Sequence, residues 1–581
     1  MFGSFWRQAA AVLAVLGLAM TGPASLAAAD VDQVQPPGQL TALDRGWIPP
    51  QPSQLTDFTT RYVINDTHLE SWGSSRVVSA NTWDGECETE WNCLDSAVCS
   101  SYEDTDCTRG IHFHTQLPLC SESIETNCVA GLTAQLDGQP RGTSFARYVD
   151  TSGPPFTGLV GKPDWTGTAT VTAAYAVADF PGDVKRGLPP AGRVSLWTAD
   201  GVAELSQNSF FAVDVVIAGE RSESTGEVTI WGFHAGVVPV AATRKPIPSP
   251  YAPTHLETTY ADGRRSVGGT GEGGGSWLDS ECRYSDREYC LRVARFPKGL
   301  NLTLDLRLTT DIAGWLHGRL DEPSVKIQEV DESTNAVSIS GGPVTLPMAV
   351  QDVKDSDMPA DLGSPQWWKD QVGRPELWTW NLFADGEFRL TWFQRVLPYF
   401  KDRSDFEVDW WAVRGVFRHE ARCMTSKSEL LGLVTTNAMM YGGLPPSFEN
   451  GRLTYRVAGL HERPDGSTTR GTYDLIMRKS VAQCLYGLKD APVSAEVSVI
   501  SEDGTEQVAT TSVAERDGWI VARATNFTFS SPRIEVTFNS PDPISIVCLK
   551  RSKAVKGPKK VTITSTDGVT PRCPKGYRKL K

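Results

Sequence analysis

The sequence predicts a mainly β protein, built from several antiparallel β-sandwich or meander domains with few short helices and stabilised by disulfide bonds. Dipeptides of the Asp-Gly and Asn-Gly type occur ten times, mostly between β-branched or apolar runs, and such dipeptides adopt the positive φ angles of tight hairpin turns. Many of these runs alternate apolar and polar residues with a period of two, as half-buried strands do. Twelve cysteines, an even number, favour disulfide pairing.

The first 29 residues are typical of a signal peptide. Arg7 supplies a positive charge, Ala9–Met20 is an apolar run, and Ala27–Ala29 provides a small-residue cleavage site. The apolar run is too short to span a bilayer comfortably, and no later segment is apolar enough to do so. We therefore expect a mature chain that is secreted and has no transmembrane segment.

Several segments have clear local predictions. Thr166–Tyr175, Phe211–Ile217 and Leu302–Leu308 read as strands, the last with four leucines on one face and polar residues on the other. Gln366–Val372 follows Ser364 and Pro365 and precedes Gly373, which predicts a short helix. A second helix is expected near residues 426–433.

Stretches rich in proline or glycine divide the chain. Lys245–Pro253 is a stiff spacer, Gly268–Gly275 is a flexible loop, and residues 342–360 suggest a further junction. The predicted segments are a signal peptide (1–29), a proline-rich leader (30–55), an N-terminal β domain with a cysteine-rich loop (56–245), a second β domain (246–345), an aromatic-rich β domain (346–490), a small β domain (491–545) and a basic, disulfide-closed C-terminal hairpin module (546–581).

All twelve cysteines are predicted to form disulfide bonds, because an exported chain meets an oxidising compartment. The competing explanation, zinc binding, lacks any C-x2-C pair. Three pairs would each close a local or domain-internal loop: Cys282–Cys290, Cys423–Cys484 and Cys548–Cys573. Six further cysteines are crowded together, allow fifteen pairings and stay unassigned: Cys87, Cys93, Cys99, Cys107, Cys120 and Cys128.

The densest apolar block, Trp367–Phe417, contains seven of the eighteen tryptophans. Asp385-Gly386 lies in its middle between two aromatic runs, so we expect a hairpin with a two-residue turn there. That turn would set two cross-strand pairs, Phe383 with Phe388 and Thr379 with Trp392. Phe406–Trp410 alternates with period two and is expected to extend the same sheet. The aromatic residues are explained most simply as core; the alternative is a platform on which carbohydrate rings stack.

Other patterns weakly suggest ligands. Gly269–Gly274 matches G-x-G-x-x-G but lacks the βαβ context of a dinucleotide site, so we interpret it as a loop. His112 and His114 would share one strand face, a spacing that can hold a metal, yet ordinary structural or exposed histidines explain it better. Three nearby acids could complete a metal or calcium site but lack the ordered calcium-loop spacing: Glu103, Asp104 and Asp106. We predict no metal and no cofactor.

Evidence for catalysis is equally thin. Glu407 and Asp409 alternate on one strand beside Trp410 and Trp411, and paired carboxylates near aromatic rings are the equipment of glycoside hydrolysis. Acids on the wet face of a strand are far commoner, and the G-x-S-x-G and H-E-x-x-H signatures are absent. No sequence motif indicates a particular catalysed reaction, so a non-enzymatic protein is the simpler prediction.

The C-terminal segment is strongly basic. After Cys548 eleven lysines and arginines oppose one aspartate, which gives this segment a formal charge of about +10 within a chain of net charge -13. Such a module suits an anionic wall polymer or an acidic envelope surface, and we predict no nucleic-acid partner; the alternative is a solubilising tail. The candidate polymer contacts are Lys550, Arg551, Lys553, Lys556, Lys559, Lys560, Arg572, Lys575, Arg578 and Lys579.

Several segments of the C-terminal part form a distinctive set: Leu433–Met439, Gly451–Val457, Ser480–Gly487, Val508–Thr511, Asp517–Trp519, Phe527–Pro532 and the closing Cys573-Pro-Lys-Gly-Tyr577. In these segments, and more weakly at Gly314–Leu320, the chain resembles an uncharacterised family of large secreted actinobacterial proteins. Members carry a basic two-cysteine hairpin that ends in C-P-x-G-Y. The resemblance implies an actinobacterial host and export, and no activity.

These observations predict a secreted structural or adhesive β protein associated with the cell envelope through its basic C-terminal module. The alternative is a secreted protein that binds or cleaves carbohydrate through the tryptophan-rich block. The ligand and the oligomeric state do not follow from the sequence.

Overall fold

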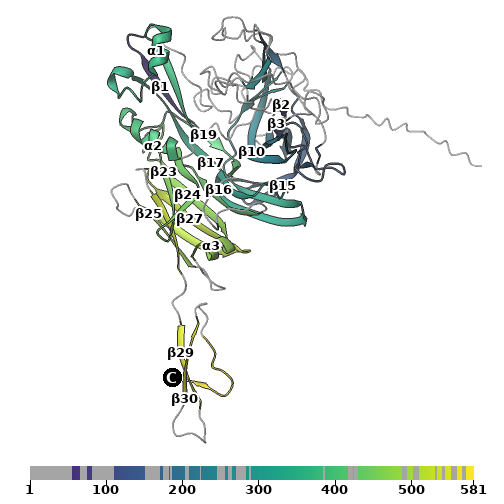
Figure 1. The fold of residues 1–581 in the computed structure, drawn as a ribbon, viewed down its shortest axis with the longest axis vertical. Coiled ribbons are helices and arrows are strands. Elements are labelled where there is room, and N and C mark those ends of the chain that lie inside the picture. Colours follow the sequence, from purple (N-terminus) through teal and green to yellow (C-terminus); the bar gives the residue numbers. More distant parts are fainter. Residues whose placement is uncertain are drawn as a thin grey trace, which may run out of the picture.

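The computed structural model is mainly β, with 63% strand and 9% helix, which confirms the predicted fold class (Figure 1). The structure describes residues 55–65, 75–80, 110–150, 170–174, 182–183, 186–202, 209–222, 224–244, 255–259, 265–269, 283–286, 289–383, 387–416, 423, 429–486, 494–500, 509–529, 533–539, 544–550, 559–565 and 571–580.

One large sheet runs through the body of the molecule. Its neighbouring strands are antiparallel except for one parallel pair, β16 (Gly314–Asp331) with β21 (Leu430–Thr436). The order is β2 (Arg76–Ala80), β3 (Gly110–Gln116), β9 (Ser209–Arg221), β10 (Val228–Arg244), β20 (Ala412–Val416), β16 (Gly314–Asp331), β21 (Leu430–Thr436), β24 (Gly471–Arg478), β27 (Trp519–Phe527) and β26 (Thr510–Arg516). Two short pairs flank it: β6 (Thr143–Tyr148) with β8 (Ser195–Ala199), and β13 (Tyr284–Asp286) with β14 (Tyr289–Val293).

Two long strands carry the chain out of this sheet. After Arg319, β16 leaves its neighbours and pairs with β17 (Thr334–Lys354). The first half of β17 also pairs with β15 (Leu300–Thr309), and its second half pairs with β19 (Phe406–Trp410). Because β17 is continuous through residue 345, the segments predicted to meet at 345–346 share one strand. The remaining strands of these two groups are β4 (Cys128–Leu136) and β5 (Gln139–Arg141) beyond β15, and β1 (Thr59–Asn65) and β18 (Leu377–Phe383) beyond β17.

The predicted alternation in Leu302–Leu308 is confirmed in β15, where every second residue from Leu300 is buried. These leucines belong to a core between the N-terminal strands and the β4–β15–β17 group. Phe211–Ile217 lies within β9, as predicted, and Thr170–Ala174 forms β7 inside the predicted run 166–175. Strand β7 pairs with β11 (His255–Thr259), which in turn pairs with β12 (Arg265–Gly269).

A second sheet covers the β21–β24–β27 part of the large sheet. Its strands are β22 (Met440–Glu449), β23 (Arg452–Ala458), β28 (Arg533–Asn539) and β25 (Ser494–Ile500), in that order. A shared core of buried aromatic and aliphatic residues fills the space between the two sheets. The strands of the predicted small domain 491–545 therefore enter both layers, since β25 and β28 pair with β23 while β26 and β27 pair with β24.

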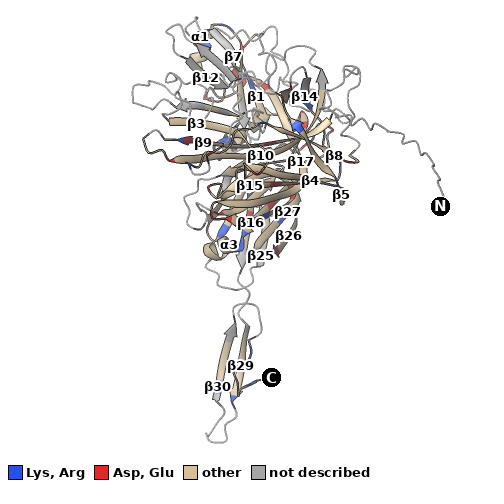
Figure 2. Ribbon diagram, turned by 90° about the vertical axis from the view of Figure 1, so that its right-hand side faces the viewer, with Lys and Arg blue, Asp and Glu red and all other residues tan. Residues whose placement is uncertain are grey.

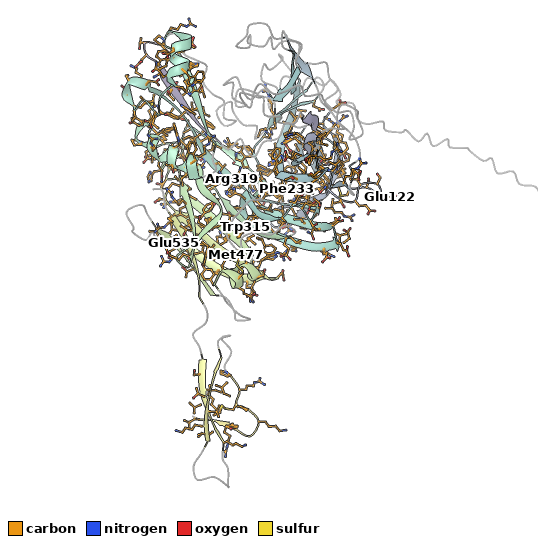
Figure 3. All side chains as sticks on the ribbon, viewed as in Figure 1. Glu122, Phe233, Trp315, Arg319, Met477 and Glu535 are labelled. Atoms are coloured by element: carbon orange, nitrogen blue, oxygen red, sulfur yellow. A yellow bond between two sulfur atoms is a disulfide. The ribbon has the colours of Figure 1, made fainter. Side chains whose placement is uncertain are left out.

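Strand β16 supplies large side chains to the interior. Trp315 is 1% exposed and Arg319 is fully buried (Figure 3). The Arg319 guanidinium donates to the carbonyl oxygens of Thr436 and Ala438, both at 2.8 Å, and lies over the ring of Tyr441. Burial removes the guanidinium N–H donors from water, and the hydrogen bonds to backbone carbonyls replace some of the hydrogen bonds that they lose.

The predicted hairpin around Asp385-Gly386 is wrong. Its first arm is β18, but its second arm is a helix, α2 (Glu387–Val396), so Phe383 does not pair with Phe388 nor Thr379 with Trp392. Leu390, Phe393 and Val396 are fully buried at intervals of three residues, the spacing of one helix face, and α2 packs against β22 and β23. Strand β19 forms as predicted but pairs with β17 rather than with the block's own strands.

The helix expected near 426–433 is also wrong, because Leu430–Thr436 is strand β21. All seven residues are buried, with β16 on one side and β24 on the other. A short apolar run of this kind fits either a buried strand or a helix, and periodicity cannot separate the two. Helix α1 (Gln366–Val372) forms as predicted and ends at Gly373, whose φ is 63°. The other helices with described bounds are α3 (Lys479–Tyr486) and the 3-10 turns η6 (Asp355–Asp357) and η7 (Leu397–Tyr399).

Three of the predicted turn dipeptides connect adjacent antiparallel strands. Asp137-Gly138, Asn450-Gly451 and Asp517-Gly518 each have positive φ at both residues, which is the geometry of the type I′ turn. In the part of the chain that the structure describes, no helix is long and apolar enough to cross a membrane.

Candidate functional site

The C-terminal residues form a small sheet of their own, apart from the body of the molecule (Figure 1). Its central strand β29 (Ile544–Lys550) pairs with β30 (Lys559–Ser565) on one side and with β31 (Arg578–Lys579) on the other. The Cys548–Cys573 disulfide, expected from the sequence, joins β29 to the segment before β31. Closing a loop of this length contributes about 3.5 kcal/mol in the chain-entropy model. We call this sheet the basic module.

The described charged residues of the basic module are all lysines and arginines (Figure 2). The described residues of the module include no aspartate or glutamate. Lys550 contacts the ring of Tyr577, with its Nζ 5.7 Å from the ring centroid. Six predicted polymer contacts are exposed: Lys550, Lys560, Arg572, Lys575, Arg578 and Lys579.

The sheet register places four of these six cations on the two faces of the sheet, while Arg572 and Lys575 lie in the segment before β31. Leu549 lies opposite Lys560 and Arg578, so these two cations share one face. Cys548 lies opposite Lys579, and Lys550 is two residues along the same strand, so Lys550 and Lys579 share the other face. Lys559 lies in β30 without a described side chain, and Arg551, Lys553 and Lys556 are outside the described residues.

Two further disulfides staple the body. Cys423–Cys484, also expected from the sequence, ties the segment before β21 to helix α3, and Cys120–Cys128 closes a short loop before β4. The other predicted half-cystines are not described: Cys87, Cys93, Cys99, Cys107 and Cys282 lie outside the described residues, as does the side chain of Cys290.

The tryptophan-rich block divides into core and surface. Trp411 is 1% exposed and donates its indole N–H to the carbonyl of Gly341 at 2.8 Å, while Trp410 is 7% exposed, so both belong to the core. Trp367 on α1 is 56% exposed, and Phe388 on α2 is 66% exposed. The interpretation as core therefore holds for Trp410 and Trp411, while Trp367 and Phe388 lie at the surface.

Aromatic rings connect the two exposed residues in a continuous row. Trp367 and Trp368 pack edge-on against Trp378, with ring centroids 5.7 and 5.3 Å away. Trp378 contacts Trp380, which contacts Trp392, which contacts Phe388, at centroid distances of 5.9, 5.3 and 6.0 Å. We call these six residues the aromatic row. It follows β18, whose only described partner strand is β1.

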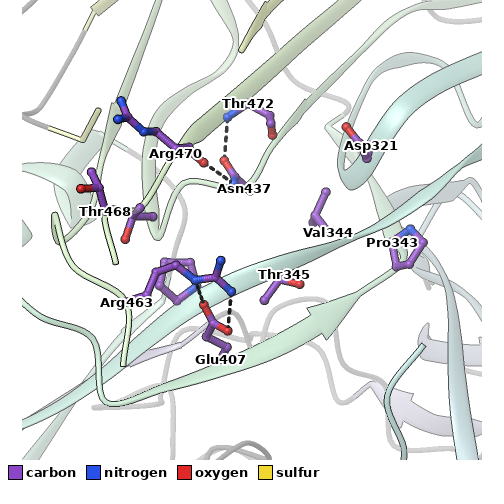
Figure 4. Close-up of a pocket in the computed structure, with 12 residues that line it drawn as sticks. Asp321, Pro343, Val344, Thr345, Glu407, Asn437, Arg463, Thr468, Arg470 and Thr472 are labelled. Atoms are coloured by element: carbon purple, nitrogen blue, oxygen red, sulfur yellow. Dashed lines mark hydrogen bonds and ion pairs between the residues drawn. The ribbon is translucent and has the colours of Figure 1, made fainter. Parts of the chain in front are cut away.

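A polar pocket of about 270 Å³ opens between β17, β19 and the segment 463–472 (Figure 4). Pro343, Val344 and Pro347 of β17 form an apolar wall. Opposite them, the side chain of Asn437 fixes the backbone, because it donates to the carbonyl of Arg470 at 2.9 Å and accepts from the amide of Thr472 at 2.7 Å. The pocket wall is thus held in place by the protein's own hydrogen bonds.

The two acids singled out in the sequence have different surroundings. Glu407 lines the pocket and forms a two-pronged ion pair with Arg463, at 2.6 and 2.8 Å. Asp409 accepts a hydrogen bond from Thr345 at 2.7 Å and lies 3.9 Å from Arg295. Burial raises the pKa of Asp409 above its usual range, against the hydrogen bond from Thr345. Each carboxylate therefore has a protein partner.

A buried carboxylate lies next to Asp321, which also lines the pocket. Asp474 on β24 is 2% exposed and 3.6 Å from the Arg523 guanidinium. Arg523 in turn contacts Asp321 at 2.6 Å and Glu322 at 3.0 Å. Burial raises the pKa of Asp474 to about 7; Arg523 opposes this shift, and the two neighbouring acids add to it.

We expect Asp474→Asn to remove the part of the pH dependence of stability that comes from titration of the Asp474 carboxyl group. The raised pKa means that the folded state holds a proton that the unfolded state releases near pH 4, so the wild type loses stability as pH rises from about 4 to about 7. The asparagine variant should gain about 2–4 kcal/mol relative to the wild type over that window, at 1.36 kcal/mol per pH unit. Urea unfolding at pH 4.5 and pH 7.5 measures the difference, and an equal difference at both pH values contradicts the assignment.

The structure describes only some of the residues in the weaker sequence patterns. His112 on β3 is exposed and 3.9 Å from Glu220, and the described residues contain no group of three metal-ligating side chains. His114 is partly buried on the same strand. Glu103, Asp104, Asp106 and most of the Gly269–Gly274 loop lie outside the described residues.

Sequence reasoning found Glu407 but missed the rest of the pocket. Arg463, Thr469 and Thr472 lie more than fifty residues from Glu407, in a loop and a strand with no motif of their own. The only local signal is Asp465-Gly466, which places a turn in this loop. Comparison with protein-family models and with curated proteins found no match to the chain.

Proposed function

We propose that this protein is exported and acts as a non-enzymatic structural or adhesive component of a bacterial cell envelope. In this proposal the signal peptide directs export, and the basic module holds the chain to an anionic wall polymer or an acidic envelope surface. Three disulfide bonds among the described residues support an oxidising destination. The C-terminal resemblance supports an actinobacterial host.

The observation that carries the proposal is the composition of the basic module. Six exposed cations and no described acid sit on one disulfide-closed sheet, while the rest of the chain carries a formal charge of about -23. Each cation near an anionic surface contributes about 1 kcal/mol, and the separate sheet lets the module approach such a surface without the acidic body. A solubilising tail would need neither a disulfide nor a paired sheet.

Fractionation of the producing cells tests this anchoring. We expect the full-length protein to remain with the envelope at low salt and to be released by about 1 M NaCl, because screening shortens the Debye length from about 10 Å at 0.1 M to about 3 Å. Recovery of the protein from the medium at low salt, with no binding to added envelopes, contradicts the proposal.

The aromatic row favours a second candidate, a secreted protein that binds or cleaves carbohydrate. Exposed aromatic rings such as Trp367 and Phe388 offer faces for sugar rings. A glycan array decides between the candidates: under this alternative the full-length protein binds a glycan and Trp367→Ala loses that binding.

A further inference from the structure

Two threonine hydroxyls of the pocket lining have no hydrogen-bond partner among the residues that the structure describes. Thr469 is 4% exposed, and the hydroxyl oxygens of Thr469 and Thr472 are buried without a hydrogen-bond partner among the described residues. Buried hydroxyls are normally paired, so two orphans in one wall need an explanation. A rotation about χ1 exchanges the hydroxyl and the methyl group of a threonine. Each hydroxyl can therefore turn toward a ligand without giving up an existing hydrogen bond.

The charges around the pocket cancel. The charged residues that line the pocket are two acids, Asp321 and Glu407, and two arginines, Arg463 and Arg470. Arg463 pairs with Glu407, while Asp321 contacts Arg523, which lies outside the lining. A carboxylate that accepts from one guanidinium still has free lone pairs, so Glu407 and Asp321 can accept hydrogen bonds from O–H donors. The guanidinium of Arg470 points away from Glu407 and Thr345 in Figure 4. The pocket thus offers acceptors and hydroxyls without a net charge to attract an ion.

We infer that this pocket binds a small neutral polyol, such as a single monosaccharide unit. A sugar supplies several O–H groups that act both as donors to carboxylates and as partners for threonine hydroxyls, and it presents C–H faces to the apolar wall of Pro343, Val344 and Pro347. The volume of about 270 Å³ is just below the ~300–1,000 Å³ of typical ligand pockets, which suits a small ligand. This site is separate from the basic module and from the aromatic row.

Titration of the full-length protein with individual sugars tests the inference. The probes are D-glucose, D-galactose, D-mannose and N-acetyl-D-glucosamine as neutral ligands and D-glucuronate as a charged one, followed by isothermal calorimetry. We expect at least one neutral sugar to bind saturably and more tightly than glucuronate. Thr469→Val and Thr472→Val should each weaken that binding about tenfold, the effect of losing one hydrogen bond to a ligand.

Unliganded stability provides an independent readout. Because the orphan hydroxyl of Thr469 has no partner to lose, Thr469→Val should leave the midpoint of thermal unfolding unchanged or raise it. Thr229→Val, at an exposed position of β10, is the matched control and should alter neither sugar binding nor the midpoint. The inference is overturned if no neutral sugar saturates the protein, if glucuronate binds more tightly, if Thr229→Val weakens binding equally, or if Thr469→Val lowers the midpoint.

Discussion

Replacing the six exposed cations of the basic module by glutamine should lower affinity for an anionic surface by about 10⁴-fold. Each cation contributes about 1 kcal/mol near such a surface, and six together contribute about 6 kcal/mol, where 1.4 kcal/mol corresponds to a factor of ten. Co-sedimentation of the full-length protein with vesicles that contain acidic lipid, and with a phosphodiester wall polymer, measures the loss. The substituted residues are Lys550, Lys560, Arg572, Lys575, Arg578 and Lys579.

A variant with the same change in net charge provides the control. Six exposed cations of the body, also four lysines and two arginines, are replaced by glutamine: Lys298, Lys326, Lys354, Lys401, Arg403 and Arg516. We expect this variant to retain the affinity of the wild type within a few fold, because its cations are spread over an acidic surface rather than gathered in one module. Equal losses in both variants would show that total charge, and not the module, determines binding.

The second large effect is expected at Trp411. Trp411→Ala should lower the free energy of unfolding by about 3–5 kcal/mol, because it empties a fully buried site and removes the indole hydrogen bond to Gly341. The backbone carbonyl of Trp411 also accepts from the amide of Val237, so this position lies where β10 meets β17. Urea unfolding followed by far-ultraviolet circular dichroism measures the loss.

Trp367→Ala is the matched comparison within the same block of sequence. Its side chain is more than half exposed, so Trp367→Ala should lower the free energy of unfolding by no more than about 1 kcal/mol. This loss reflects the edge contact with Trp378. Similar losses in the free energy of unfolding for the two alanine variants would contradict the division of the block into core and surface.

Local sequence signals predicted much of the fold because each depends on few residues. The leucine alternation in β15, the positive-φ turns at Asp137-Gly138 and Asn450-Gly451, and helix α1 all appear where their patterns place them. The predictions that failed concern the tertiary partners of a segment. α2 carries apolar residues on one face and β21 is an apolar run throughout. Packing of α2 against β22 and β23, and of β21 between β16 and β24, decides which segment is helix and which is strand.

Domain boundaries could not follow from composition, because β16 and β17 each belong to more than one group of strands. The run at 342–360 suggested a junction, yet residues 342–354 of it lie inside β17, where Pro343 and Pro347 occupy strand positions. The basic module, by contrast, could be predicted, since its charge, its two cysteines and its strands are contiguous in sequence.

The proposed sugar-binding pocket, unlike the basic module, could not be predicted from the sequence. Its residues come from β16, β17, β19 and the 463–472 segment, and each residue type is ordinary at its own position. Unpaired hydroxyls and cancelled charges are properties of the assembled site, so no spacing in the sequence could have indicated them.

The salt dependence of binding is the direct test of whether the basic module anchors the protein electrostatically. Association of the full-length protein with acidic vesicles should be measured from 0.05 to 1 M NaCl, beside vesicles of neutral lipid. We expect tight binding to the acidic vesicles at low salt, a steep decline as salt rises, and no binding to neutral vesicles at any salt concentration. Binding that is insensitive to salt, or equal on both kinds of vesicle, would contradict an electrostatic anchor.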